Sequence, residues 1–149
     1  GAIYATNSIL NMDGSSSLLI NSAVYGGAIY AMNSTVSIDG SSFLAGNSAA
    51  YGGAIWTSGS TMNIDGKTTF LANLATNNGG ATFSRSSSVA TIRGIALFWH
   101  NEADDDGGGV SSEESEIHFE GDFHFSGNDA FTGGAVHIVN GSLVASAGT

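Results

Sequence analysis

The feature that most constrains the fold of this chain is an internal repeat with a period of 26 to 28 residues. A Gly-Gly pair followed by small and apolar residues begins at Gly26, Gly52, Gly79, Gly107 and Gly133. A second segment, usually apolar-Asp-Gly, follows each pair, and a third segment ends in Asn21, Asn47, Asn73, Asn101 and Asn128. Three segments that keep one period over five units predict a repeat protein whose units stack on one another.

Each unit contains three short segments in which apolar and polar residues alternate, with turn-forming residues between them. Val36-Ser37-Ile38 and Ile117-His118-Phe119 have this alternation, which is typical of strands. We therefore predict an all-β parallel β-helix (a solenoid) of about five to six coils, with three short strands per coil. Residues 1–149 form a single segment in this prediction, a fragment of a longer repeat protein, with divergent acidic coils at 100–129.

The coil prediction gives most of the recurring residues a structural role. The apolar residues expected to stack in the core are Leu10, Met12, Leu18, Val36, Ile38, Leu44, Met62, Ile64, Phe70, Ala90, Ile92, Phe98, Ile117, Phe119 and Phe125. The five asparagines fall at one corner, where amides that both donate and accept can bridge successive coils. The glycine pairs fall at another corner, where a side chain would not fit.

The same segments resemble the GGA[ILV]/FxxN repeats of chlamydial polymorphic outer membrane proteins and related secreted right-handed parallel β-helix proteins. The matching segments are Gly26–Ile29, Gly52–Ile55, Gly133–Val136, Phe70–Asn73, Phe98–Asn101 and Phe125–Asn128, and the departures are Leu18, Leu44, Thr82 and Gly109. The resemblance implies a right-handed coil and a surface-exposed adhesive passenger.

Composition narrows the classes of partner and chemistry. The chain has 3 Lys and Arg against 13 Asp and Glu, a net charge of −10, so we predict no nucleic-acid partner. Cysteine is absent, which excludes disulfides and thiolate metal sites. All charged residues after Trp99 are acidic, and they number ten.

These carboxylates provide the metal candidates. We predict no cofactor other than Ca²⁺, whose candidate ligands are Asp104, Asp105, Asp106, Glu120 and Asp122. The alternative is an extended, solvated turn. A second series, formed by Asp13, Asp39, Asp65, Arg93 and Glu120, is either an oxygen-rich stack or a set of solvated turns in which Arg93 relieves the repulsion between its neighbours.

Two further sets of residues are candidates for surface functions. One aromatic residue per coil, at Tyr4, Tyr30, Trp56 and Phe83, predicts an outward stripe that binds sugar rings or a protein, or a ladder that stabilises itself. Ser111 and His137 continue this series. Asn33 and Asn140 begin N-glycosylation sequons, which are used only in a secreted eukaryotic protein.

We predict an extracellular or cell-surface structural or adhesive segment (a stalk, filament or passenger-type repeat) without catalytic residues. Its expected partners are other copies or flanking coils end to end, and glycans. The alternative is a carbohydrate-binding or polysaccharide-processing β-helix. A lyase would need a basic residue beside its acidic ones, and Lys67, Arg85 and Arg93 all lie outside the acidic stretch. No carboxylate pair stands out as that of a glycosidase.

Overall fold

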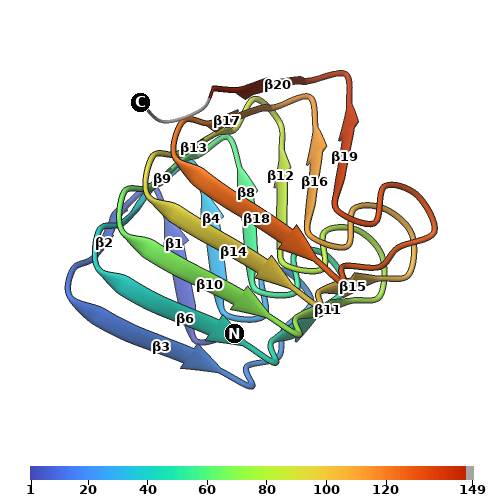
Figure 1. Ribbon diagram of the computed structural model, residues 1–149. Helices are drawn as coiled ribbons and strands as arrows, with labels where there is room; N and C mark the ends of the chain where they lie inside the picture. The colour runs from blue at the N-terminus through green and yellow to red at the C-terminus, as the bar shows by residue number, and fades with distance from the viewer. Residues whose placement is uncertain (147–149) are drawn as a thin grey trace.

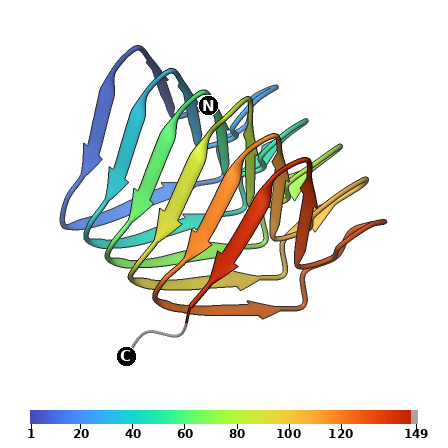
Figure 2. The same ribbon diagram turned by 90° about the horizontal axis from the view of Figure 1, so that it is seen from above.

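The computed structural model of this chain describes residues 1–146 and is a parallel β-solenoid of about six turns (Figure 1). Successive coils lie one behind another along a single axis (Figure 2). Its described residues form strands and turns, and none belongs to a helix long and apolar enough to cross a membrane. The predicted all-β fold with three strands per coil is confirmed.

Three long parallel sheets form the sides of the solenoid. Sheet A contains β1 (Ile3–Thr6), β4 (Ile29–Met32), β8 (Ile55–Ser58), β12 (Thr82–Arg85), β16 (Val110–Glu113) and β19 (Val136–Val139). Sheet B contains β2 (Ile9–Met12), β5 (Thr35–Ile38), β9 (Thr61–Ile64), β13 (Val89–Ile92), β17 (Glu116–Phe119) and β20 (Ser142–Ala145). Sheet C contains β3 (Ser15–Leu19), β6 (Ser41–Ala45), β10 (Lys67–Leu71), β14 (Ile95–Trp99) and β18 (Asp122–Ser126).

A fourth, shorter sheet adds to the three strands predicted for each coil. Sheet D contains the two-residue strands β7 (Ser48–Ala49), β11 (Leu74–Ala75) and β15 (Glu102–Ala103). The alanine of each strand is buried, and the residue before it faces solvent or is half-buried. Two residues are too few for alternation to be recognised in the sequence, so this sheet was not predicted.

The strands pair in the register that the repeat predicts. Leu10 lies beside Val36 and Val36 beside Met62, so chemically equivalent side chains stack coil on coil. All fifteen predicted core residues lie in or against one hydrophobic cluster. Leu10, Leu18 and Phe125, which belong to the outer coils, are half-buried, and the other twelve are buried.

The Gly-Gly corner requires glycine at both positions. The first glycine of each pair has a positive φ, which is 58° at Gly26. Residues other than glycine adopt such a φ only at a cost in conformational energy. At the second position, a Cβ on Gly53 would lie 2.1 Å from the carbonyl oxygen of Gly80 in the next coil. The backbones of successive coils therefore meet here without room for a side chain, as predicted.

Candidate functional site

The asparagine corner forms a continuous ladder of hydrogen bonds, as predicted. The backbone N–H and Nδ2 of Asn47 both donate to Oδ1 of Asn73, each at 3.0 Å. Nδ2 of Asn73 donates to Oδ1 of Asn101 and to the carbonyl oxygen of Leu44, each at 2.9 Å. The same pattern extends to Asn21 and Asn128. Because the three central asparagines are fully buried, this corner is a structural element and leaves no surface for a ligand.

A second ladder, of serines, was not predicted. It lies at the corner between sheets A and B and consists of Ser8, Ser34, Ser60, Ser88 and Ser115. The N–H of Ser34 donates to Oγ of Ser60 at 3.1 Å, and Oγ of Ser60 donates to the carbonyl oxygen of Ser58 at 2.9 Å. The signal in the sequence is a serine at the same place in five successive units, which the abundance of serine elsewhere in the chain conceals.

The series of charged residues at the corner between sheets B and C contains two ion pairs. Nη1 of Arg93 lies 3.2 Å from Oδ1 of Asp65, and Nε of Arg93 lies 3.2 Å from Oε2 of Glu120. The hydrogen bond and charge of Asp65, with a smaller contribution from Glu120, raise the pKa of Arg93. The position of Arg93 fits the predicted relief of repulsion between its acidic neighbours.

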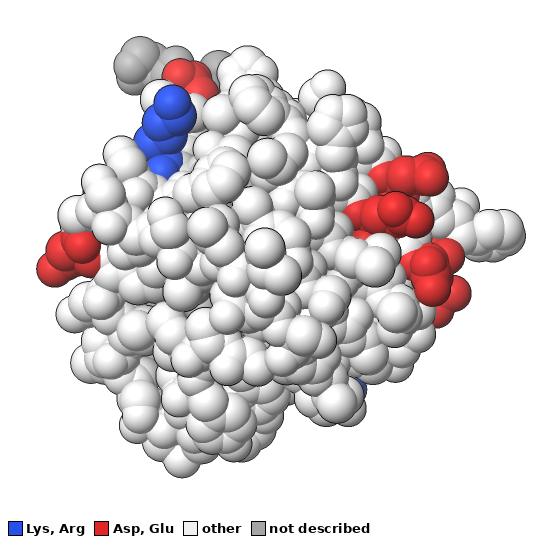
Figure 3. All heavy atoms as spheres, turned by 90° about the horizontal axis from the view of Figure 1, so that it is seen from below, with Lys and Arg blue, Asp and Glu red and all other residues white. Residues whose placement is uncertain are grey.

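The structure does not bring the five candidate Ca²⁺ ligands together. Asp104, Asp105 and Asp106 lie in the turn between β15 and β16, whereas Glu120 and Asp122 lie at the turn between β17 and β18. Viewed from below, acidic side chains stand in separate places on the surface (Figure 3). Within residues 1–146, no group of three or more Asp, Glu or His side chains is arranged to hold a metal ion. The five residues thus belong to two separate turns, and binding of Ca²⁺ at either of them stays a prediction.

The predicted aromatic stripe is a stacked row on the outer side of sheet A. The ring of Tyr30 stacks on Tyr4 and on Trp56, with centroids 4.6 Å apart in both pairs. Trp56 and Phe83 are nevertheless buried, because the turns before the glycine pairs fold over them. The ring centroids of Tyr25 and Trp56 are 5.3 Å apart. In the next turn, the ring of Tyr51 packs against Phe83, with centroids 5.6 Å apart.

Only the first part of this row is open to a ligand. Tyr4 is exposed and Tyr30 is half-buried, and with Tyr25 they border a hollow of about 350 Å³ beside the first coil. Burial, together with the neighbouring Tyr4 and Tyr25, raises the pKa of Tyr30. The stripe therefore offers a ligand at most this small hollow, and the buried rings belong to the second of the two predicted roles, a self-stabilising ladder.

The row continues with Ser111 and His137 on β16 and β19. Nδ1 of His137 lies 3.7 Å from a carboxylate oxygen of Asp106, in the turn that covers these strands. Ser111 lies beside His137 in register but is fully buried. A buried hydroxyl cannot meet a substrate, so this set of serine, histidine and aspartate provides no accessible nucleophile.

Both predicted sequon asparagines lie at the corner between sheets A and B. Asn33 and Asn140 are exposed and have φ values of 49° and 52°. Ser34, the middle residue of the first sequon, is buried in the serine ladder. Each asparagine side chain thus has access to solvent, and attachment of a glycan stays a prediction.

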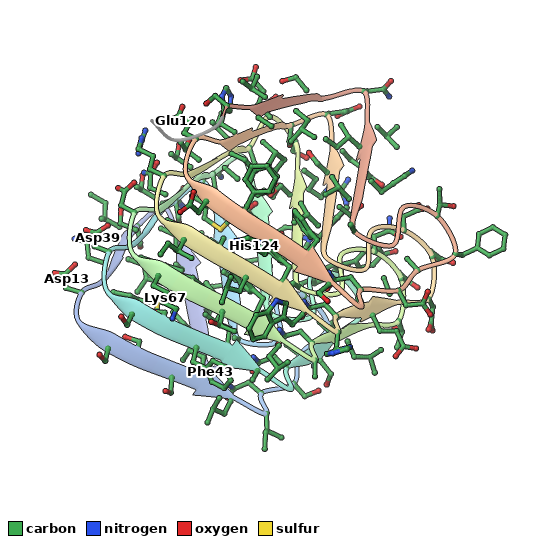
Figure 4. All side chains as sticks on the ribbon, in the orientation of Figure 1. Asp13, Asp39, Phe43, Lys67, Glu120 and His124 are labelled. Carbon is green, nitrogen blue, oxygen red and sulfur yellow. The ribbon has the colours of Figure 1, made fainter. Side chains whose placement is uncertain are left out.

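A further surface with exposed apolar side chains lies elsewhere, on the outer side of sheet C. The sheet C face, as we name it, consists of the three outward residues of each strand: Ser15, Ser17, Leu19, Ser41, Phe43, Ala45, Lys67, Thr69, Leu71, Ile95, Leu97, Trp99, Asp122, His124 and Ser126. Figure 4 looks onto this face, with Phe43, Lys67 and His124 on three of its strands. Phe43 and Trp99 are 37% and 40% exposed.

The sheet C face follows from strand alternation. Leu44, Phe70 and Phe98 point into the core, so their neighbours along each strand must point out. The sequence signal for this face is the set of inward residues predicted on these strands, because their neighbours must then point outward, whereas the predicted binding stripe consists of the aromatic residues of sheet A. Apolar residues at these outward positions indicate an interaction site, because positions that face water are usually polar.

Comparisons with protein-family models, with curated proteins and with solved structures found no match for this chain. The candidate site therefore rests on the geometry of the chain itself. Of the surfaces described above, the sheet C face combines exposed aromatic rings with one cationic and one anionic side chain.

Proposed function

We propose that this chain is a structural and adhesive β-helix segment of an extracellular or cell-surface protein, without catalytic activity, and that the sheet C face makes its contacts. The observation that carries the proposal is that several large apolar side chains are exposed together on the outer side of one sheet, among them Leu19, Phe43, Ile95 and Trp99. Contiguous exposed apolar surface of this kind marks interaction sites on folded proteins.

The scaffold beneath the face supports an adhesive role. Asn73 and Ser60 belong to hydrogen-bonded ladders that tie each coil to the next at two corners. The rings of Phe70 and Phe98 stack with centroids 4.8 Å apart immediately beneath the face. Such a support holds the outward side chains in a fixed plane, which favours binding because little conformational entropy is lost on contact.

The resemblance of the repeats to those of chlamydial polymorphic outer membrane proteins supports the proposed location at a cell surface. The placement of charged groups supports a non-catalytic segment. Arg93, a candidate base for lyase chemistry, is held between Asp65 and Glu120 in two ion pairs. A guanidinium whose pKa is raised in this way is a poor proton acceptor.

An adhesion assay tests this proposal. Beads coated with the chain are passed under flow over animal-cell layers, plant cell walls and bacterial cells, and the fraction of beads retained on each surface is measured. We expect retention on at least one of these surfaces. The double variant Phe43→Ser/Trp99→Ser should lose it, because it removes both exposed rings of the face. Phe131→Ser is the matched control, since Phe131 is 92% exposed and lies outside the face, in the turn between β18 and β19.

Retention by the parent and by Phe131→Ser, with loss in the double variant, is the expected result. Circular dichroism melts of all three proteins establish that they fold alike. Absence of retention on every surface, or equal retention of the double variant, would overturn the proposal.

A further inference from the structure

We propose that the sheet C face binds a neutral, linear, β-linked polysaccharide whose sugar rings stack on Phe43 and Trp99. The inference rests on the proposed adhesive function and adds the chemical class of its ligand. Sugar rings of this kind have C–H faces that pack on apolar and aromatic side chains, and hydroxyl edges that bind polar ones.

The charge of the face points to a neutral ligand. The chain as a whole has a net charge of −10, yet the fifteen residues of the sheet C face include one cationic side chain, Lys67, and one anionic side chain, Asp122. Both lie in the first outward position of their strands, at the edge of the face. A cationic partner would be drawn to the acidic turns and corners elsewhere, and an anionic polymer would be repelled by them.

The spacing of the two exposed rings suits a chain of sugars. Phe43 lies on β6 and Trp99 on β14, with β10 between them. Two strand spacings place the rings roughly 10 Å apart along the solenoid axis. On β10, Thr69 lies beside Phe43 and Leu71 lies beside Trp99, so a linear chain that runs diagonally from Phe43 over Leu71 to Trp99 meets apolar side chains along its path.

Polar side chains alternate with apolar ones along the central column of the face, where they can bind sugar hydroxyls. Ser17 and Thr69 belong to the same column of the face as Phe43, and His124 ends that column. Their hydroxyl and imidazole groups donate and accept hydrogen bonds. A ligand with apolar ring faces and polar edges therefore matches the face in both respects.

The size of the face argues against a second protein molecule as occupant. Five strands at about 4.8 Å spacing and five residues at about 3.3 Å each give an area of roughly 400 Å². A stable protein–protein interface covers about 800 Å² on each partner. The face is therefore too small for a stable dimer and large enough for a short run of sugar rings.

Titration with cellohexaose and chitohexaose, followed by tryptophan fluorescence, tests the proposal. Trp99 is on the face and Trp56 is buried, so the variant Trp56→Phe should keep the fluorescence change and Trp99→Phe should lose it. The double variant Phe43→Ser/Trp99→Ser has no reporter on the face, so its affinity is measured by retardation in gels that contain a β-linked glucan. We expect its binding to be weaker by about tenfold or more, and Phe131→Ser to bind as the parent does.

Two further measurements keep the outcome decisive. Binding of a neutral ligand should change little between low and high salt, because no ion pairs form. Dextran, an α-linked glucan, should bind more weakly than the β-linked probes. Absence of binding to both β-linked probes, or equal retardation of the double variant, would overturn the inference. If the beads still adhere in that case, the adhesive function stands and its ligand is of another class.

Discussion

Replacement of Asn73 by alanine should be among the most destabilising changes at any corner of the solenoid. Its side chain makes four hydrogen bonds: it accepts two from Asn47 and donates one each to Asn101 and Leu44. A buried hydrogen bond contributes about 1 kcal/mol net, and the backbone N–H of Asn47, left without an acceptor, adds about 1 to 3 kcal/mol. We expect Asn73→Ala to lower the free energy of unfolding by about 5 kcal/mol.

Urea unfolding followed by circular dichroism measures this loss. Asn101→Ala is a matched comparison, since its side chain also makes four hydrogen bonds and is also fully buried. Asn21→Ala should cost no more than about 1 kcal/mol, because the half-buried side chain donates one bond, to Asn47, and water can replace it. Equal losses in the variants of Asn73 and Asn21 would refute the reasoning that burial within the ladder sets the energy.

Three other predictions follow from particular side chains. The hydroxyl of Thr68 is buried without a hydrogen-bond partner among residues 1–146, so Thr68→Val should stabilise the fold by about 1 kcal/mol, whereas Thr69→Val, on the outer side, should have little effect in the same urea assay. The raised pKa of Tyr30 means that its neutral phenol stabilises the fold fully below a pH of about 10, and that this stabilisation is lost as the pH rises through the raised pKa. The difference between the phenol absorbance titrations of the parent and Tyr30→Phe should have its midpoint above 10; a midpoint at or below 10 contradicts the burial of this ring. Arg93→Gln should lower the midpoint of thermal unfolding at low salt, and the difference should shrink at high salt, because its two ion pairs are exposed; a difference independent of salt would point to packing instead.

The repeat allowed the solenoid, its register and its core to be predicted, because one period places equivalent residues side by side. Val36 and Met62 lie 26 residues apart and are neighbours in sheet B. The same argument explains why the five candidate Ca²⁺ ligands lie in two separate turns. Asp106 and Glu120 are 14 residues apart, about half a coil, so they fall on different sides of the solenoid.

The cover over the aromatic row could not be predicted from alternation. Alternation indicates that Trp56 points away from the core, but it does not indicate which segment lies against the outer side of its sheet. The turn that contains Tyr25 does not show the alternation of apolar and polar residues that marks a strand. The ring of Tyr25 nevertheless packs on Trp56. The serine ladder was missed for a different reason, since it depends on the register of one residue type that is common throughout the chain.

We expect the sheet C face to be the surface through which this segment binds its ligand. Mapping of backbone amide chemical shifts during titration with cellohexaose tests it most directly. The shifted amides should lie on β6, β10 and β14, with the largest changes near Phe43 and Trp99. Shifts centred on the hollow beside Tyr4, or on the acidic turn at Asp104, would contradict it.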